Sequence, residues 1–306
     1  MPASPLLPYV WMLSGCFAFA IMAVLVRGLK EACDWQEIAI ARTALAMIFA
    51  AALAVRGGAK LVFLRPRTLW MRSIAGSISL LCGFYAMTHY PISEVLTLTN
   101  MFPLWVAVLS WPLLGEHAPL EVWPAVAVGL LGVLLIQLSV RDQQPPEATR
   151  EMLQQATLAM SAALLSAFTS AIALIGLHRL KELDPRAIVA HFSGVALLFS
   201  LGAMFFAPRE VTPPLTSHAL LLLLGVGLSA TVGQLFLTKA FTTGSPARIS
   251  VIGLSQVGFA MLLEILIFHR TFTSLTLLGM GLAIAPTVWI LVRRASEART
   301  LTSPAD

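Results

Sequence analysis

The chain has 306 residues, of which 58% are hydrophobic and only 11% are charged, and its formal net charge is +5. Soluble domains carry roughly 25% charged residues, so this composition excludes a protein whose whole surface faces water. The positive charges stand at the ends of apolar segments, which argues against a nucleic-acid-binding protein.

The apolar residues fall into ten segments, arranged as two sets of five. Each segment approaches the roughly 20 residues with which a helix crosses about 30 Å of hydrocarbon. The sequence therefore predicts an all-α integral membrane protein with ten transmembrane helices. The expected spans lie near 8–26, 36–55, 69–89, 91–113, 119–140, 153–177, 186–206, 218–238, 246–268 and 272–292.

A recurring phrase indicates that the two sets are copies of one unit. Leu-Lys-Glu stands at 29–31 and again at 180–182, followed by Asp34 and Asp184 and then by an apolar segment. Because each copy holds an odd number of spans, the second is expected upside down relative to the first. Such 5+5 inverted repeats are typical of secondary transporters, whose substrate site lies near the midplane. The expected divisions are a first repeat at 1–140, an extracytoplasmic linker at 141–152, a second repeat at 153–293 and a cytoplasmic tail at 294–306.

The distribution of basic residues predicts the orientation. If the chain threads regularly, thirteen Lys and Arg residues, Arg72 among them, lie on one side of the membrane and six on the other. An excess of positive residues near span ends marks the cytoplasmic face. We therefore expect both termini in the cytoplasm and a multi-pass protein of the plasma membrane, typically the bacterial inner membrane.

Polar residues at membrane depth are costly and usually face a cavity or one another. Arg42 lies seven residues into the second span, where it either binds an anionic substrate group or a gate partner, or serves a structural role bonded to broken-helix carbonyls or a glutamate. Tyr85, near the outer end of the third span, is a candidate for stacking on substrate or hydrogen-bonding it. The alternative for Tyr85 is a place in the interfacial aromatic belt.

The fourth span carries a polar stripe. Ser93, Thr97 and Asn100 follow an i, i+4, i+7 spacing and so share one helical face. Pro103 removes a helical hydrogen bond, which a membrane helix tolerates only where other groups satisfy the freed carbonyl. The stripe predicts a cavity wall, to which the deeper Trp105 is also assigned. The alternative is hydrogen bonding that holds helices together.

The second half offers matching polar groups. Gln234 in the eighth span and Gln256 in the ninth are predicted to bind substrate from the opposite side. His191, early in the seventh span, is either a titrating group in a proton-coupled cycle or a packing histidine. Glu94 and Glu264 both lie near the outer face, where either is a candidate partner of Arg42 in an outer gate or a proton site.

Taken together, these features resemble the ten-helix EamA-type branch of the drug/metabolite transporter superfamily. The matching residues are 42–45, 83–87, 91–94, 102–104 and the Leu-Gly-Glu at 114–116, with Gly129 and Gly132 in the fifth span. The resemblance implies a central cavity lined chiefly by the first four helices of each half, and alternating access for a small metabolite. The second half departs from the pattern at Val257, which stands in the place of Pro103, and at 268–270, so strict symmetry of the gates is not expected.

The alternative functions for such a membrane protein are those of a multispanning membrane enzyme, a non-transporting scaffold and a channel. An enzyme of this kind needs convergent groups such as a metal-binding cluster or a nucleophile with its base, whereas the six histidines are scattered. We therefore expect a secondary transporter of a small polar metabolite, of the amino acid or organic anion class. No enzymatic activity, cofactor, metal or nucleic-acid partner is expected, and the protein is predicted to meet membrane lipid as a monomer or homodimer.

Overall fold

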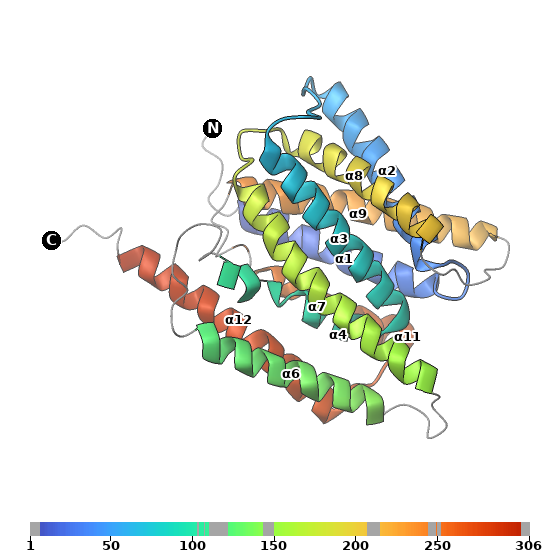
Figure 1. The fold of residues 1–306 in the computed structure, drawn as a ribbon, viewed down its shortest axis with the longest axis vertical. Coiled ribbons are helices and arrows are strands. Elements are labelled where there is room, and N and C mark those ends of the chain that lie inside the picture. Colours follow the sequence, from blue (N-terminus) through green and yellow to red (C-terminus); the bar gives the residue numbers. More distant parts are fainter. Residues whose placement is uncertain are drawn as a thin grey trace.

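The computed structural model describes residues 7–102, 104–106, 108–109, 122–142, 150–206, 215–243, 249 and 252–300. These residues form helices joined by turns and short loops (Figure 1). The predicted all-α membrane fold is confirmed. The helices are α1 (Leu7–Gly28), α2 (Trp35–Arg56), α3 (Arg67–His89), α4 (Ile92–Thr99), α6 (Val122–Asp142), α7 (Arg150–His178), α8 (Pro185–Phe206), α9 (Ser217–Thr243), α11 (Ser255–Phe268) and α12 (Ser274–Thr300).

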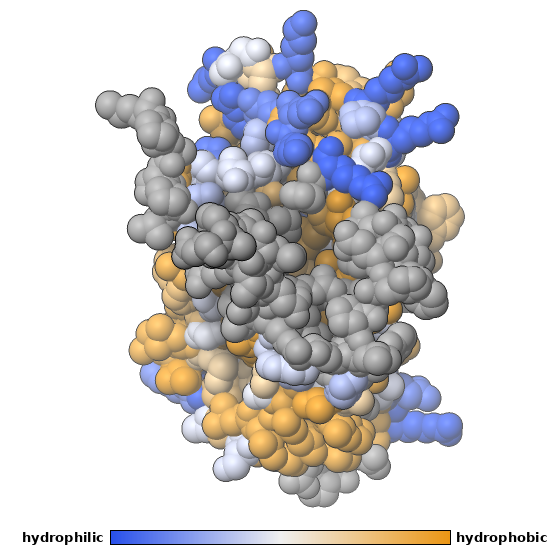
Figure 2. All heavy atoms as spheres, turned by 90° about the vertical axis from the view of Figure 1, so that its left-hand side faces the viewer, coloured by the Kyte–Doolittle hydropathy of each residue, from blue (hydrophilic) through white to orange (hydrophobic). Residues whose placement is uncertain are grey.

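The outer surface is apolar, as a lipid-facing surface must be. Five described helices, α1, α2, α7, α8 and α9, are apolar and long enough to cross a bilayer. Large hydrophobic side chains point outward, among them Phe205 and Phe206, which are 82% and 91% exposed. In Figure 2, hydrophilic side chains gather at the upper end of the view, and hydrophobic residues predominate among the coloured residues below them. A soluble protein rarely exposes so much contiguous apolar surface.

The recurring Leu-Lys-Glu phrase forms the same corner in both halves. Leu29 and Leu180 are buried, at 0% and 2% exposure, and each lies in the turn that ends a helix. At the start of the next helix, the backbone N–H of Asp34 donates to the Glu37 carboxylate at 3.2 Å. In the second corner, the Asp184 carboxylate accepts from the backbone N–H of Arg186 at 2.8 Å. Both acidic residues thus lie where a helix begins and leaves its N–H groups unpaired.

The most extensive helix contacts join one half of the chain to the other. Helix α1 packs on α9, α3 on α7, α2 on α8 and α6 on α12, and a smaller contact joins α4 to α11 (Figure 1). If each helix is replaced by its counterpart in the other half, so that α1 becomes α7 and α9 becomes α3, the α1–α9 pair becomes the α7–α3 pair. The other three pairs each join a helix to its own counterpart and stay unchanged. A two-fold relation between the repeats produces this pattern. The inverted placement of the repeats in a membrane stays a prediction.

The helices of the fourth and ninth spans, expected near 91–113 and 246–268, are interrupted. Helix α4 ends at Thr99, and the side-chain amide of Asn100 donates to the carbonyl oxygen of Leu96 at 2.8 Å. The backbone N–H of Asn100 donates to the same oxygen at 2.9 Å, and the break precedes Pro103, which lies outside the described residues. Helix α11 begins at Ser255 after a turn at Leu254. Broken helices of this kind line substrate sites in transporters.

Helices α6 and α12 approach each other through glycines. A Cβ atom placed on Gly132 would lie 2.5 Å from the backbone nitrogen of Ala283 and 2.6 Å from the carbonyl oxygen of Gly279. A Cβ on Gly279 would in turn lie 2.9 Å from the carbonyl oxygen of Gly132. The two backbones are therefore in direct contact, as small residues allow in membrane helix pairs.

Candidate functional site

A cavity of about 220 Å³ lies between the two halves. Its walls come from α1, α2, α3 and the α4 region of the first half, and from α7, α8, α9 and α11 of the second. This confirms the expectation, drawn from the resemblance, that the first four spans of each half enclose the central cavity. The cavity is smaller than the roughly 300–1,000 Å³ of drug-sized sites.

Four of the six predicted substrate-binding residues line this cavity. Arg42 and Asn100 come from the first half, and Gln234 and Gln256 come from the second. The Nη2 of Arg42 donates to Oε1 of Gln234 at 3.4 Å. The structure therefore brings these polar side chains together across the interface between the repeats.

Arg42 is 4% exposed and lies in the middle of α2. Its Nε and Nη1 have no hydrogen-bond partner within the described part of the chain. Neither a broken-helix carbonyl nor a glutamate of that part bonds it, so the structural alternative for Arg42 finds no support there. Its guanidinium instead lies over the ring of Phe192, with Cζ 5.4 Å from the ring centroid.

The expectation that Arg72 lies at the cytoplasmic surface is wrong. Arg72 is 4% exposed, lines the central cavity and places Cζ 4.0 Å from the centroid of the same Phe192 ring. Its Nε and Nη1 also lack a partner among the described residues. The signal in the sequence is its place within α3, one turn before Gly76, whose missing side chain leaves room for a guanidinium.

A serine cluster that sequence reasoning missed completes the polar wall. The hydroxyl of Ser79 on α3 lies 2.6 Å from that of Ser170 and 3.0 Å from that of Ser166, both on α7. All three serines line the cavity. The i, i+4 spacing of Ser166 and Ser170 places both on one helical face and is the signal that could have found them.

Tyr85 and Trp105 are not among the described residues that line this cavity, and their assignment to the substrate site stays a prediction. The Tyr85 ring stacks on His89, with centroids 4.4 Å apart, and meets the Trp35 ring edge-on. The Trp105 ring packs edge-on against Phe168 at 5.3 Å.

His191 occupies a fully bonded position. Its Nδ1 lies 2.8 Å from the hydroxyl of Ser73, and its Nε2 lies 3.1 Å from the carbonyl oxygen of Phe63. Trp70 meets the imidazole ring edge-on at 4.9 Å. A carbonyl accepts only, so Nε2 carries a proton, while the Ser73 hydroxyl can donate to Nδ1 or accept from it. This is the geometry of the packing alternative.

Replacing His191 by alanine is expected to destabilise the protein by about 1–3 kcal/mol, because the buried hydroxyl of Ser73 loses its partner and the imidazole loses its packing against Trp70. The exposed His218 provides the control, and His218→Ala is expected to change stability by less than about 0.5 kcal/mol. Thermal unfolding of both purified variants measures the difference. A role confined to packing also leaves uptake rates of the folded His191→Ala protein unchanged, and a lost pH dependence of uptake would contradict it.

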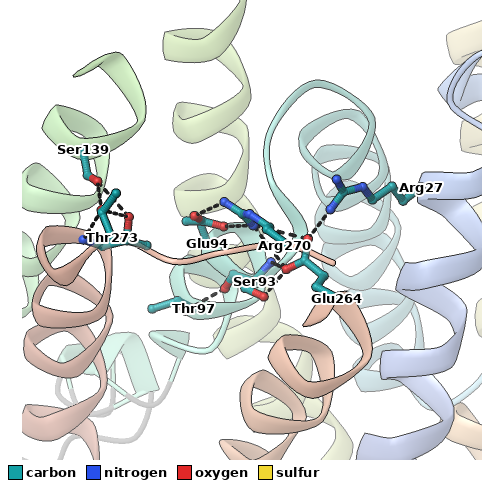
Figure 3. Close-up of polar contacts among 9 residues, drawn as sticks. Arg27, Ser93, Glu94, Thr97, Ser139, Glu264, Arg270 and Thr273 are labelled. Atoms are coloured by element: carbon teal, nitrogen blue, oxygen red, sulfur yellow. Dashed lines mark hydrogen bonds and ion pairs between the residues drawn. The ribbon is translucent and has the colours of Figure 1, made fainter. Parts of the chain in front are cut away.

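Glu94 and Glu264 belong to an ion-pair network that joins the halves at one end of the bundle (Figure 3). Arg270 donates to both oxygens of Glu94, at 2.6 and 2.9 Å, and reaches Glu264 at 3.2 Å. Arg27 donates to Glu264 at 2.5 Å, and the Ser93 hydroxyl bonds the same carboxylate. Both carboxylates are fully buried.

This network corrects the expected pairing of either glutamate with Arg42. The carboxylates stand at the beginning of α4 and near the end of α11, whereas Arg42 lies in the middle of α2. Arg27 and Arg270 lie at the same end as the two glutamates and form ion pairs with them. Sequence reasoning places Arg27 and Arg270 among the peripheral charges and assigns them no partner.

A second cavity, of about 190 Å³, adjoins the network. Arg27, Lys30 and Arg270 line it together with His89 and Met87. Met87 also lines the central cavity. This one side chain of α3 therefore borders both spaces.

Known proteins agree with this architecture. The chain is 29% identical over 236 residues to the pseudopaline exporter CntI of Pseudomonas aeruginosa, covering 77% of this chain and 78% of the relative. It is 24% identical to a probable transport protein of Saccharomyces cerevisiae, covering 75% and 68%. It is 23% identical to the mouse solute carrier family 35 member G1, covering 74% and 62%.

A solved crystal structure shares the fold with a TM-score of 0.66 at 18% identity, covering 99% of this chain and all of that one. The EamA-like transporter family matches twice, over residues 6–138 and 157–292. The relatives and the family point to a transporter rather than to an enzyme. The two matches take in both halves and the helices that line the central cavity. The chain belongs to the EamA-like transporter family.

Proposed function

We propose that this membrane transporter moves a small polar metabolite, of the amino acid or organic anion class, by alternating access through the central cavity. The observation that carries the proposal is the meeting of buried polar side chains from both repeats in one cavity, with Arg42 bonded to Gln234 across the interface. A scaffold has no need of polar groups at that depth, where they cost free energy.

The ion-pair network supports alternating access. It ties Ser93 and Glu94 of the first half to Glu264 and Arg270 of the second, at one end of the α4–α11 pair. The bonds hold that end together in this conformation, and rocking of one repeat against the other breaks them and admits solute there. We infer that this is the extracytoplasmic end.

The basic loops support that orientation. The side chain of Arg186 donates to the carbonyl oxygen of Leu53, so the loops after α2 and α7 share one end of the bundle. That end carries exposed Arg56, Lys60 and Arg67, as expected of a cytoplasmic face in a bacterial inner membrane. The exporter named among the relatives favours export as the direction.

Uptake into liposomes tests the proposal. Purified protein is screened with labelled amino acids, carboxylates and S-adenosylmethionine, and then with Arg42→Ala and Asn100→Ala. Each variant is expected to lose at least about tenfold in transport rate, since a hydrogen bond to a charged group contributes about 1.5–3 kcal/mol. The matched control is Arg56→Ala, an exposed arginine on the helix that carries Arg42. Folded Arg42→Ala and Asn100→Ala proteins that transport at the wild-type rate would refute the assignment of the site.

A further inference from the structure

Two buried arginines share the central cavity and the same aromatic ring. Arg42 on α2 and Arg72 on α3 each place a guanidinium against Phe192 of α8, at 5.4 and 4.0 Å from the ring centroid. Both are 4% exposed, and each has two nitrogens without a hydrogen-bond partner in the described residues. Two like charges are therefore held close together in a site that shields them from water.

No described residue that lines this cavity is acidic. The buried carboxylates of Glu94 and Glu264 are committed to Arg27 and Arg270 at the end of the bundle. A buried charge without a carboxylate partner costs several kcal/mol. A cavity with two such cations and no anion among its described lining residues is built to receive negative charge from a ligand.

The wall of the cavity is shaped around these cations. A Cβ atom on Gly76 would lie 2.7 Å from Nη1 of Arg72 and 2.9 Å from Cε2 of Phe192. Glycine one turn after Arg72 therefore lets the guanidinium lie along α3 against the ring. The arginine fork in this position matches the geometry of a carboxylate or phosphate group.

We propose that the cavity binds a small organic anion with two negative charges, a dicarboxylate or a phosphate monoester, and that Arg42 and Arg72 neutralise it. The inference rests on the proposed function, because it names the substrate class of the same site. The remaining polar atoms of the ligand lie within reach of the side-chain amides of Asn100, Gln234 and Gln256, which also line the cavity. The volume of about 220 Å³ limits the ligand to a small metabolite.

Binding to the purified full-length protein tests the charge of the ligand separately from transport. Succinate, succinamate and succinamide have nearly the same size and carry two, one and no negative charges at pH 7.5. Ligand-induced thermal stabilisation reports their affinities. Succinate is expected to bind about 10-fold to 100-fold more tightly than succinamate, as one lost charged hydrogen bond predicts. The second arm of the experiment compares the binding of glycerol phosphate with that of glycerol. Tight binding of glycerol phosphate indicates a single phosphate group held by both arginines, whereas tight binding of succinate indicates one carboxylate on each arginine.

Arg42→Gln and Arg72→Gln are each expected to weaken binding of the preferred dianion by about 10-fold to 100-fold. Arg56→Gln and Arg67→Gln, exposed arginines on the same two helices, are matched controls and leave binding unchanged. Without ligand, the cavity variants are expected to unfold at the same or a higher temperature than the wild type, because an unpaired buried charge has been removed. If an arginine has a purely structural role, its variant is expected to unfold at a lower temperature than the wild type.

Each outcome decides the proposal. Preferential binding of succinate or of glycerol phosphate, lost in the two cavity variants, supports it. Equal binding of succinate and succinamate, dianion binding that survives Arg72→Gln, or no binding of any dianion overturns it. Arg42-dependent uptake of a zwitterionic amino acid without dianion binding would refute the dianion while leaving the transporter intact. Dianion binding without uptake in liposomes would refute transport and leave the anion site intact.

Discussion

Replacing Glu264 by glutamine is expected to destabilise the protein by about 3–5 kcal/mol, the usual cost of removing one partner from a buried ion pair. The Glu264 carboxylate is fully buried and accepts from Arg27, Arg270 and Ser93. Glutamine keeps the size of the side chain but presents an uncharged amide to two guanidinium groups. Thermal and denaturant unfolding of the purified protein measure the loss.

Two further variants make this prediction specific. Glu31→Gln removes a carboxylate from the exposed α1–α2 loop and is expected to change stability by less than about 0.5 kcal/mol. The double variant Glu264→Gln with Arg27→Gln removes both charges of one pair and leaves the Arg270–Glu94 pair in place. It is expected to recover part of the lost stability. If Glu264→Gln is as stable as Glu31→Gln, the network does not hold the two halves together.

The second large effect concerns the contact between α6 and α12. Gly132→Leu is expected to prevent the two helices from packing, because even a Cβ atom would lie within 3 Å of three backbone atoms of α12. Backbone cannot turn aside as a side chain does, so the helices must separate. Gly132→Ala is expected to cost about 1–3 kcal/mol, the usual range for overpacking, and Gly132→Leu more.

Gly281 on α12 is the matched control, because a Cβ atom there meets nothing within 4 Å. Gly281→Leu is expected to leave the yield of monodisperse protein and its unfolding temperature close to those of the wild type. Size-exclusion profiles in detergent and thermal unfolding compare the variants. A Gly132→Leu protein that behaves like Gly281→Leu would show that α6 and α12 need not touch.

The helical membrane fold is predictable because it depends on a composition that every segment shares. Spans of apolar residues and the Leu-Lys-Glu corners lie in the local sequence, and the helices α1, α2, α7, α8 and α9 follow them closely. This apolar composition does not predict the breaks after α4 and before α11. At the first break, the side-chain amide of Asn100 adds a second hydrogen bond to the carbonyl oxygen of Leu96, a contact that no hydropathy pattern records.

The candidate site is predictable only in part. Arg42, Asn100, Gln234 and Gln256 stand out because a polar residue in the middle of an apolar span usually faces a cavity or another polar group. Arg72 escapes prediction since it lies near the start of α3, where an arginine normally reaches the membrane surface. The packing of α8 decides the difference, because Phe192 holds the Arg72 side chain inward. The partners of Glu94 and Glu264 are likewise set by tertiary contacts that the sequence does not display.

The pairing of helices across the two halves has a consequence for how the protein folds during synthesis. Helices α1, α2 and α3 find their main partners only in α9, α8 and α7, which the ribosome makes later. Until α8 is made, Arg42 and Arg72 lack their contact with the ring of Phe192. We therefore expect this chain to complete its folding only after α9 has been synthesised.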